Sequence, residues 1–158
     1  MISTTDPAAA LEELSFCIGR AYYNYKLLLE RTLKDLGLDR HVSPGMGHLL
    51  FALFEEDDCI IRGLAEKTRL SLPTLTLMLR KMEKAGLLRS RRDPDDGRAV
   101  RIRLTPLGRS LEPRCREVLR RLNAVLGSGL TRKDVTRAKK SLARMIENMR
   151  RDEETSGG

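Results

Sequence analysis

The side chains that carry most enzyme and metal chemistry are few in this 158-residue chain, and they stand far apart. The three cysteines, Cys17, Cys59 and Cys115, form no CxxC pair, which disfavours a zinc ribbon or a disulfide framework. The two histidines, His41 and His48, have a spacing that matches no common metal motif. The sequence contains no phosphate-binding loop, HExxH pair or serine–histidine–aspartate arrangement. We therefore expect no enzyme activity, no metal and no cofactor.

Charge is the stronger chemical signal. The chain has 30 lysine and arginine residues against 22 aspartate and glutamate residues, and its net charge is +8. Residues 1–58 carry −5, residues 59–105 carry +7 and residues 106–158 carry +6. A basic block behind an acidic segment predicts a polyanionic partner, with nucleic acid ahead of a membrane surface, although a solvated basic face has the same composition. Aromatic residues make up only 4%, which argues against a platform that stacks the bases of single strands.

Membrane and export signals are missing from the sequence. No apolar run approaches the roughly 18 residues of a membrane span. Residues 1–10 lack the basic start and apolar block of a signal peptide. We expect a cytoplasmic protein with no membrane partner.

The basic block predicts two short helices joined by a tight connection. The first spans Arg62–Thr68, and Ser71 caps the second, which has Pro73 in its first turn and Gly86 at its end. The inner face of the second helix consists of Leu75, Met78, Leu79 and Met82. This is a helix-turn-helix pattern, but an ordinary helical hairpin in a core has the same pattern, and this stretch alone does not separate the two.

A β-hairpin follows directly and favours the helix-turn-helix. Leu87–Arg92 and Ala99–Leu104 are predicted strands, separated by the turn residues Asp93–Gly97. Arg98 stands at the tip, and the strands carry further arginines: Arg89, Arg91, Arg92, Arg101 and Arg103. A hairpin in this place is a wing, and an arginine at its tip suits a narrow minor groove.

Long helices are predicted on both sides. Asp6-Pro7 begins a helix that runs to Leu36, with Gly37 as its stop, and its two apolar stripes favour packing against a second chain as well as its own core. Ser43-Pro44 begins a helix to Phe54, which the acidic residues 55–58 end before a short strand at 59–61. A helix from Pro106 to Leu126, kinked or broken at Pro113, precedes a last helix capped by Thr131.

Together these elements predict a mainly α fold with a small β-hairpin wing. The predicted winged helix-turn-helix region covers residues 43–105. Residues 7–36 and 107–151 form a predicted helical dimerisation region, and residues 152–158 a frayed tail.

In this order and spacing, the segments resemble the MarR family of winged helix-turn-helix transcriptional regulators. The resemblance runs from about Ser43 to Leu111 and rests on Leu64-Ala65-Glu66, Leu70-Ser71, Pro73-Thr74-Leu75-Thr76, Met82–Leu87, Arg92–Ala99 and Leu104–Gly108. It implies a homodimer that binds a palindromic site in double-stranded DNA, usually as a repressor released by a small ligand.

The resemblance also implies which residues face DNA. On the second helix of the helix-turn-helix they are Ser71, Pro73, Thr74, Thr76, Leu77, Arg80 and Lys81, and on the wing they are Arg91, Asp96 and Arg98. Arg98 would enter the minor groove, and Asp96 would hold or orient wing arginines.

Three positions depart from the family pattern. Leu77 stands where the family often has an arginine, and a leucine cannot read a guanine edge but can touch a thymine methyl, unless it is simply buried. Arg69 replaces a frequent turn glycine, so that turn must avoid positive φ or accept strain. Thr68 replaces a frequent apolar residue.

A ligand pocket is a further implication of the resemblance. In this family a pocket between the first helix, the Ser43–Phe54 helix and the Leu107–Leu126 helix often binds small aromatic acids. We expect Arg20, Tyr25, Met46 and Phe51 to line it here, for a small aromatic or phenolic ligand.

The sequence also leaves different functions open. Cys17 resembles the cysteine of a peroxide-sensing branch of the family, with Tyr22, Tyr23 and Tyr25 as sources of hydroxyls, and this would make the protein a thiol-based repressor. A small buried hydrophobe is the plainer interpretation of Cys17. A non-specific architectural DNA binder and a winged helix that binds protein instead of DNA would carry much of the same pattern.

Overall fold

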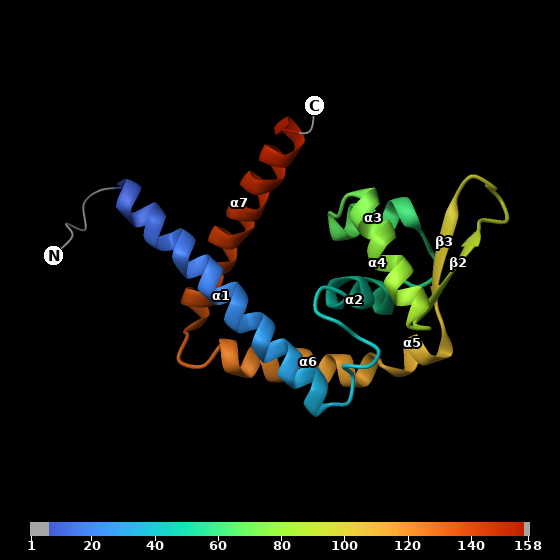
Figure 1. Ribbon diagram of the computed structural model, residues 1–158, viewed down its shortest axis with the longest axis horizontal. Helices are drawn as coiled ribbons and strands as arrows, with labels where there is room; N and C mark the ends of the chain where they lie inside the picture. The colour runs from blue at the N-terminus through green and yellow to red at the C-terminus, as the bar shows by residue number, and fades with distance from the viewer. Residues whose placement is uncertain (1–6, 157–158) are drawn as a thin grey trace. The chain divides into compact units, whose positions relative to one another are not determined.

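The computed structural model describes residues 7–156 and divides into two compact units, one up to Leu122 and one from Asn123 onward. In chain order the elements are α1 (Pro7–Asp35), α2 (Gly47–Glu55), β1 (Cys59–Ile60), α3 (Ile61–Thr68), α4 (Leu72–Lys84), β2 (Leu88–Arg92), β3 (Val100–Leu104), α5 (Pro106–Ser110), α6 (Glu112–Leu126) and α7 (Arg132–Ser156) (Figure 1). The mainly helical fold with a small hairpin is confirmed. None of the helices in residues 7–156 has both the length and the apolarity needed to cross a bilayer.

The connection between α3 and α4 is tight because one residue takes a left-handed conformation. Arg69 has φ of 55°, so this turn accepts the strain that a non-glycine residue brings to positive φ. Two residues on, the Ser71 hydroxyl accepts the Thr74 N–H and caps α4, as predicted. The helix-turn-helix is therefore locally determined at both its turn and its cap.

The hairpin belongs to a three-stranded antiparallel sheet of order β1-β3-β2. Leu88 pairs with Leu104 at the base of the hairpin and Arg92 with Val100 toward its tip, while Cys59 of β1 pairs with Ile102. Ile102 and Leu104 face the core, and Arg103 is exposed, as the alternating pattern predicted. The short strand after α2 thus extends the wing's sheet by one strand.

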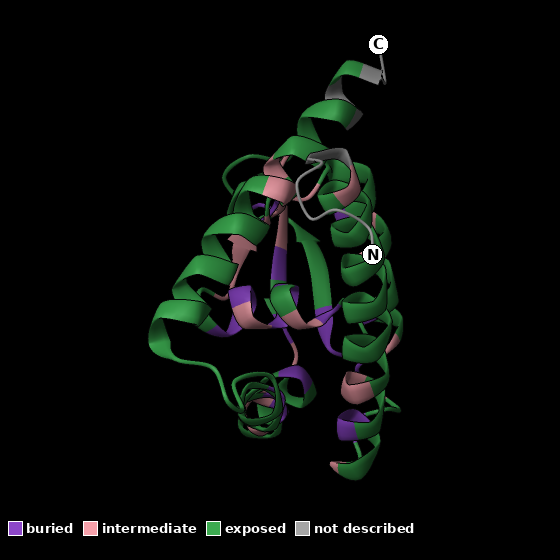
Figure 2. Ribbon diagram, turned by 90° about the vertical axis from the view of Figure 1, so that its left-hand side faces the viewer, coloured by how far each residue is buried: buried purple, intermediate pink, exposed green. Residues whose placement is uncertain are grey.

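One apolar core supports α2, α3, α4 and the base of the sheet (Figure 2). Its fully buried side chains include Leu49, Leu50, Leu64, Leu75, Met82 and Leu88. The C-terminal part of α1 joins this core through Leu33, and Gly37 (φ 62°) ends α1 so that Leu38 is also buried. The outer face of α4 is exposed and is not part of the core.

Large apolar side chains remain exposed on the long helices of both units. On α1 they include Leu11, Ile18 and Tyr22, and on α7 they include Leu142, Ile146 and Met149. Exposed apolar stripes of this length are typical of helix faces that pack against another helix.

Three boundary predictions need correction or lie outside the description. α2 begins at Gly47 rather than at Ser43, because Gly45 has φ of 95° and interrupts the helical path. The last helix continues to Ser156, so the tail predicted to fray from Asp152 is helical up to that point; no glycine or proline interrupts it before Gly157. The predicted cap at Asp6 lies outside the described residues. The break at Pro113 is confirmed, because α5 ends at Ser110 and α6 begins at Glu112.

Candidate nucleic-acid interface and pocket

The outer face of α4 is the first half of the candidate interface. Ser71, Pro73, Thr74, Leu77, Arg80 and Lys81 are exposed, and Thr76 is half-buried. Several hydroxyls on this face are already engaged within the helix. Ser71 donates to the Thr74 hydroxyl at 2.8 Å, and Thr76 donates to the carbonyl of Leu72 at 2.7 Å. The side chains without such local bonds are Pro73, Leu77, Arg80 and Lys81.

Leu77 resolves one open question from the sequence. Its side chain is 57% exposed, so it is not a core residue. A large apolar group therefore stands among polar neighbours on the surface of this helix.

The wing is the second half of the candidate interface, and two carboxylates hold two of its six arginines, Arg91 and Arg101. Asp58 accepts hydrogen bonds from Arg91 at 2.9 Å and from the Nε of Arg101 at 3.1 Å. Asp93, whose side chain is 5% exposed, accepts from the other end of Arg101 at 2.8 Å. Arg101 thus joins the loop before β1 to the turn of the hairpin, and Arg91 is anchored beside it.

The protonation states follow from this arrangement. The hydrogen bond from Arg101, followed by those from the backbone N–H groups of Asp96 and Asp95, lowers the pKa of Asp93 to about 2. The hydrogen bond from Arg101 and the charge of Arg91 likewise lower the pKa of Asp58, against an opposing effect of burial. Both carboxylates are therefore ionised at neutral pH, and the network keeps its charge pairs.

The predicted role of Asp96 needs correction. Its carboxylate accepts the backbone N–H of Arg98 at 3.0 Å and makes no ion pair with a wing arginine in residues 7–156. Asp96 therefore fixes the backbone of Arg98, whereas Asp58 and Asp93 hold the side chains of Arg91 and Arg101. The side chain of Arg98 is exposed at the tip and makes no ion pair with a carboxylate in the same range of residues.

Sequence reasoning missed the residues that fix the wing to the rest of the first unit. Asp57 accepts the N–H of Leu104 at 2.8 Å, and Glu83 of α4 accepts the N–H of Ser90 at 2.8 Å. In the sequence, the acidic residues 55–58 indicated only the end of a helix. The one available signal was their place directly before a strand, opposite an arginine-rich hairpin.

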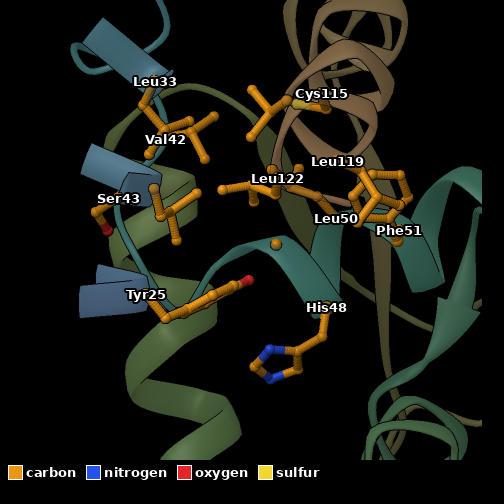
Figure 3. Close-up of a pocket in the computed structure, with 14 residues that line it drawn as sticks. Tyr25, Leu33, Val42, Ser43, His48, Leu50, Phe51, Cys115, Leu119 and Leu122 are labelled. Carbon is orange, nitrogen blue, oxygen red and sulfur yellow. The ribbon is translucent and has the colours of Figure 1, made fainter. Parts of the chain in front are cut away.

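A cavity of about 350 Å³ lies in the first unit, as the family resemblance implied. It is lined from α1, the loop before α2, α2 and α6 by Tyr25, Leu29, Leu33, Val42, Ser43, Gly45, Gly47, His48, Leu50, Phe51, Cys115, Val118, Leu119 and Leu122. Tyr25 reaches toward α2 at the end where His48 lies, and Leu33 and Cys115 lie at the other end (Figure 3). The cavity is therefore mainly apolar, with polar groups gathered at one end.

Two of the four predicted pocket residues line this cavity, and two do not. Tyr25 and Phe51 are lining residues. Met46 is instead buried in the core, because the helix starts later than predicted, and Arg20 is exposed on α1 more than one turn before Tyr25. His48, not chosen from the sequence, lines the cavity, and partial burial lowers its pKa, which favours the neutral imidazole.

The remaining candidates for chemistry are separate from one another. In the single chain, Cys17 is exposed on α1. Cys115 is buried in the cavity wall, and burial raises the pKa of its thiol. In residues 7–156, histidine, cysteine and carboxylate side chains form no group of three suited to a metal ion.

Comparison with known proteins places this architecture in one family. Residues 42–100 match the family model described as the MarR family. The HTH-type transcriptional repressor IacR of Pseudomonas putida is 28% identical over 134 residues, which cover 85% of this chain and 78% of that protein. The organic hydroperoxide resistance transcriptional regulator of Bacillus subtilis is 30% identical over 101 residues, which cover 63% of this chain and 67% of that protein.

A solved structure shares the fold. The PcaV transcriptional regulator of Streptomyces coelicolor, crystallised with its natural ligand, superposes with a TM-score of 0.72 at 24% identity, covering 92% of this chain and 98% of that one. The matched region of the family model contains the helix-turn-helix and most of the hairpin described above. The chain belongs to the MarR family of transcriptional regulators.

Proposed function

We propose that the protein is a homodimeric, sequence-specific transcriptional repressor that binds double-stranded DNA. The observation that carries this is the pairing of a capped helix, whose outer face is exposed, with an arginine-rich hairpin in which carboxylates hold the side chains of Arg91 and Arg101. α4 would enter the major groove with Ser71, Pro73, Thr74, Thr76, Leu77, Arg80 and Lys81 facing DNA, and Arg98 would enter the minor groove. Arg91 and Asp96 would support the wing. This role involves no catalysis and belongs in the cytoplasm.

The exposed apolar stripes on α1 and α7 support the dimer. Each stripe would be covered by a second copy, so residues 7–36 and 107–151 would serve as the dimerisation region around the DNA-binding region at 43–105. A two-fold dimer presents two recognition helices, and a palindromic site with half-sites about 34 Å apart would match them.

Selection of bound genomic fragments, followed by fluorescence anisotropy on the selected duplex, tests the proposal. Arg98→Ala should cost about 1–3 kcal/mol of binding free energy with dimerisation unchanged. Arg137→Ala, which removes an exposed arginine from α7, is the matched control and should leave affinity within about twofold. Equal recovery of all fragments would favour the non-specific architectural binder, and a monomer at micromolar concentration would contradict the dimer.

The cavity is proposed as the site of a regulatory ligand. Its volume lies in the range of small-molecule pockets, and apolar walls with Tyr25, Ser43 and His48 as polar groups suit a small aromatic acid or phenol. Binding there would release the repressor from DNA.

A matched pair of substitutions tests the pocket. Val118→Phe places a ring where Val118 lines the cavity, and Val125→Phe makes the same change at a 58% exposed position at the end of α6. Calorimetric titration with salicylate and hydroxybenzoates should detect binding to wild type and to the Val125 variant only. If the Val118→Phe variant binds these compounds as tightly as wild type does, the ligand site lies elsewhere.

Thiol sensing is the second candidate, favoured by the exposed Cys17 and by the similarity to a regulator named for organic hydroperoxide resistance. Treatment of the protein–DNA complex with cumene hydroperoxide distinguishes the two mechanisms. Thiol sensing would be established if the peroxide releases wild type and Cys115→Ser from DNA but does not release Cys17→Ser. It would be excluded if the peroxide leaves the affinity of wild type for DNA unchanged.

A further inference from the structure

Leu77 occupies the centre of the outer face of α4. The buried residues of this helix are Leu75, Leu79 and Met82. With about 100° between successive residues, Leu77 points away from the middle of that buried stripe. Arg80 and Lys81, one turn further on, are its exposed neighbours on the same face.

Leu77 is the more exposed of the two large apolar side chains that α4 leaves exposed, at 57% against 46% for Leu72. The hydroxyls of Ser71 and Thr74 are bonded to each other, and that of Thr76 is bonded to a backbone carbonyl. The charged ends of Arg80 and Lys81 are suited to phosphates or guanine edges. A leucine has no hydrogen-bonding group, so the one feature of a base edge that it can favour is the C5-methyl of thymine.

We propose that Leu77 is a specificity-determining residue that reads a thymine methyl in each half-site. This inference rests on the proposed DNA binding and adds the identity of one base to it. Contact between the leucine and the methyl removes apolar surface of both groups from water, which gives a preference for thymine over uracil that hydrogen bonding cannot give. The charge of Arg80 and Lys81 on either side of the contact matches the phosphates that border the groove.

Replacement of thymine by uracil in the selected duplex is the direct test, because it removes only the methyl group. Deoxyuridine is introduced at one thymine position at a time, symmetrically in both half-sites, and the dissociation constant of the full-length protein is measured by anisotropy. At one position we expect about a fourfold loss for each methyl, and thus about sixteenfold for the symmetric pair. Leu77→Ala should bind the thymine and uracil duplexes equally.

A matched variant separates this contact from general effects of uracil on DNA. Leu72 is 46% exposed on the same helix but lies close to the side of the buried stripe, and Leu72→Ala should keep the full preference for thymine. The proposal for Leu77 would be overturned if the protein binds specifically but uracil lowers the affinity of wild type at no position. It would also be overturned if Leu77→Ala keeps the wild-type preference for thymine. Either result would leave the repressor function standing. Absence of binding to any duplex would overturn both.

Discussion

Gly108 lies at the joint where the wing enters α5, and its replacement by alanine is the sharpest test of how this joint is built. A Cβ at position 108 would lie 2.0 Å from the carbonyl oxygen of Leu87 and 3.2 Å from the Leu104 side chain. That oxygen already accepts the N–H of Thr105 at 3.0 Å, and the Thr105 hydroxyl donates to the carbonyl of Gly86 at 2.6 Å. Thr105, the N-cap of α5, is thus bonded to the segment that connects α4 to β2.

The size of the effect follows from these contacts. Real Cβ atoms essentially never approach another heavy atom closer than 3.0 Å, so the Leu87 carbonyl would have to move by at least about 1 Å. Such overpacking costs about 1–3 kcal/mol, and loss of the hydrogen bond from Thr105 costs about 1–3 kcal/mol more. We expect Gly108→Ala to lower the free energy of unfolding by about 2–6 kcal/mol, a large share of the total of a small protein.

Urea denaturation followed by circular dichroism measures this difference. Gly63→Ala is the matched control, because Gly63 lies in α3 and a Cβ added there would have no heavy atom within 4 Å. Alanine there should raise the free energy of unfolding by up to about 1 kcal/mol, since it reduces the entropy of the unfolded chain. A Gly108→Ala protein as stable as wild type would refute the close packing of this joint.

Three further predictions concern the wing and the turn. Asp96→Ala should weaken DNA binding while Asp96→Asn should not, because the Arg98 N–H needs only an oxygen acceptor; equal anisotropy titrations for both variants would contradict this role. The pKa of Asp93 is lowered from 3.8 to about 2, so its contribution to stability is complete above pH 3.8 and is lost as the pH falls toward 2; in acid titrations the stability difference between wild type and Asp93→Asn should shrink over that window. Arg69→Gly should raise the thermal midpoint by relieving about 1 kcal/mol of left-handed strain, and a lowered midpoint would show that the Arg69 side chain stabilises the turn.

The local signals in the sequence were sufficient for most of the fold. Ser71 and Thr131 were recognisable caps because in each the side-chain hydroxyl accepts the backbone N–H of the residue three positions on. The wing was recognisable because alternation and a dense turn act over a few residues. The start of α2 was not recognisable from the sequence, because Ser43-Pro44 has the composition of a helix cap. Only the positive φ of Gly45 shows that the helix begins later, at Gly47.

The candidate site was less accessible because its important contacts join distant segments. Asp58 lies 33 residues from Arg91 and 43 from Arg101, a pairing that no short pattern reveals. The family resemblance pointed to Asp96 for the arginines, whereas in the structure the buried Asp93 forms the ion pair with Arg101. In the sequence, the spacing of His48 from His41 did not fit a metal site. Its position on α2 instead places His48 at the cavity.

The ion pairs of the wing also change how many counterions its binding can release. Each phosphate that a cationic side chain neutralises lowers the slope of log K against log salt by about 0.9. If all six arginines of each wing neutralised phosphates, the two wings of a dimer would contribute a slope of about −11 by that rule. Arg91 and Arg101, however, already neutralise carboxylates, which leaves Arg89, Arg92, Arg98 and Arg103 without such partners in residues 7–156 and a wing contribution nearer about −7. As the salt concentration rises to the physiological value, the hairpin's contribution to DNA affinity should therefore decrease less than its number of arginines implies.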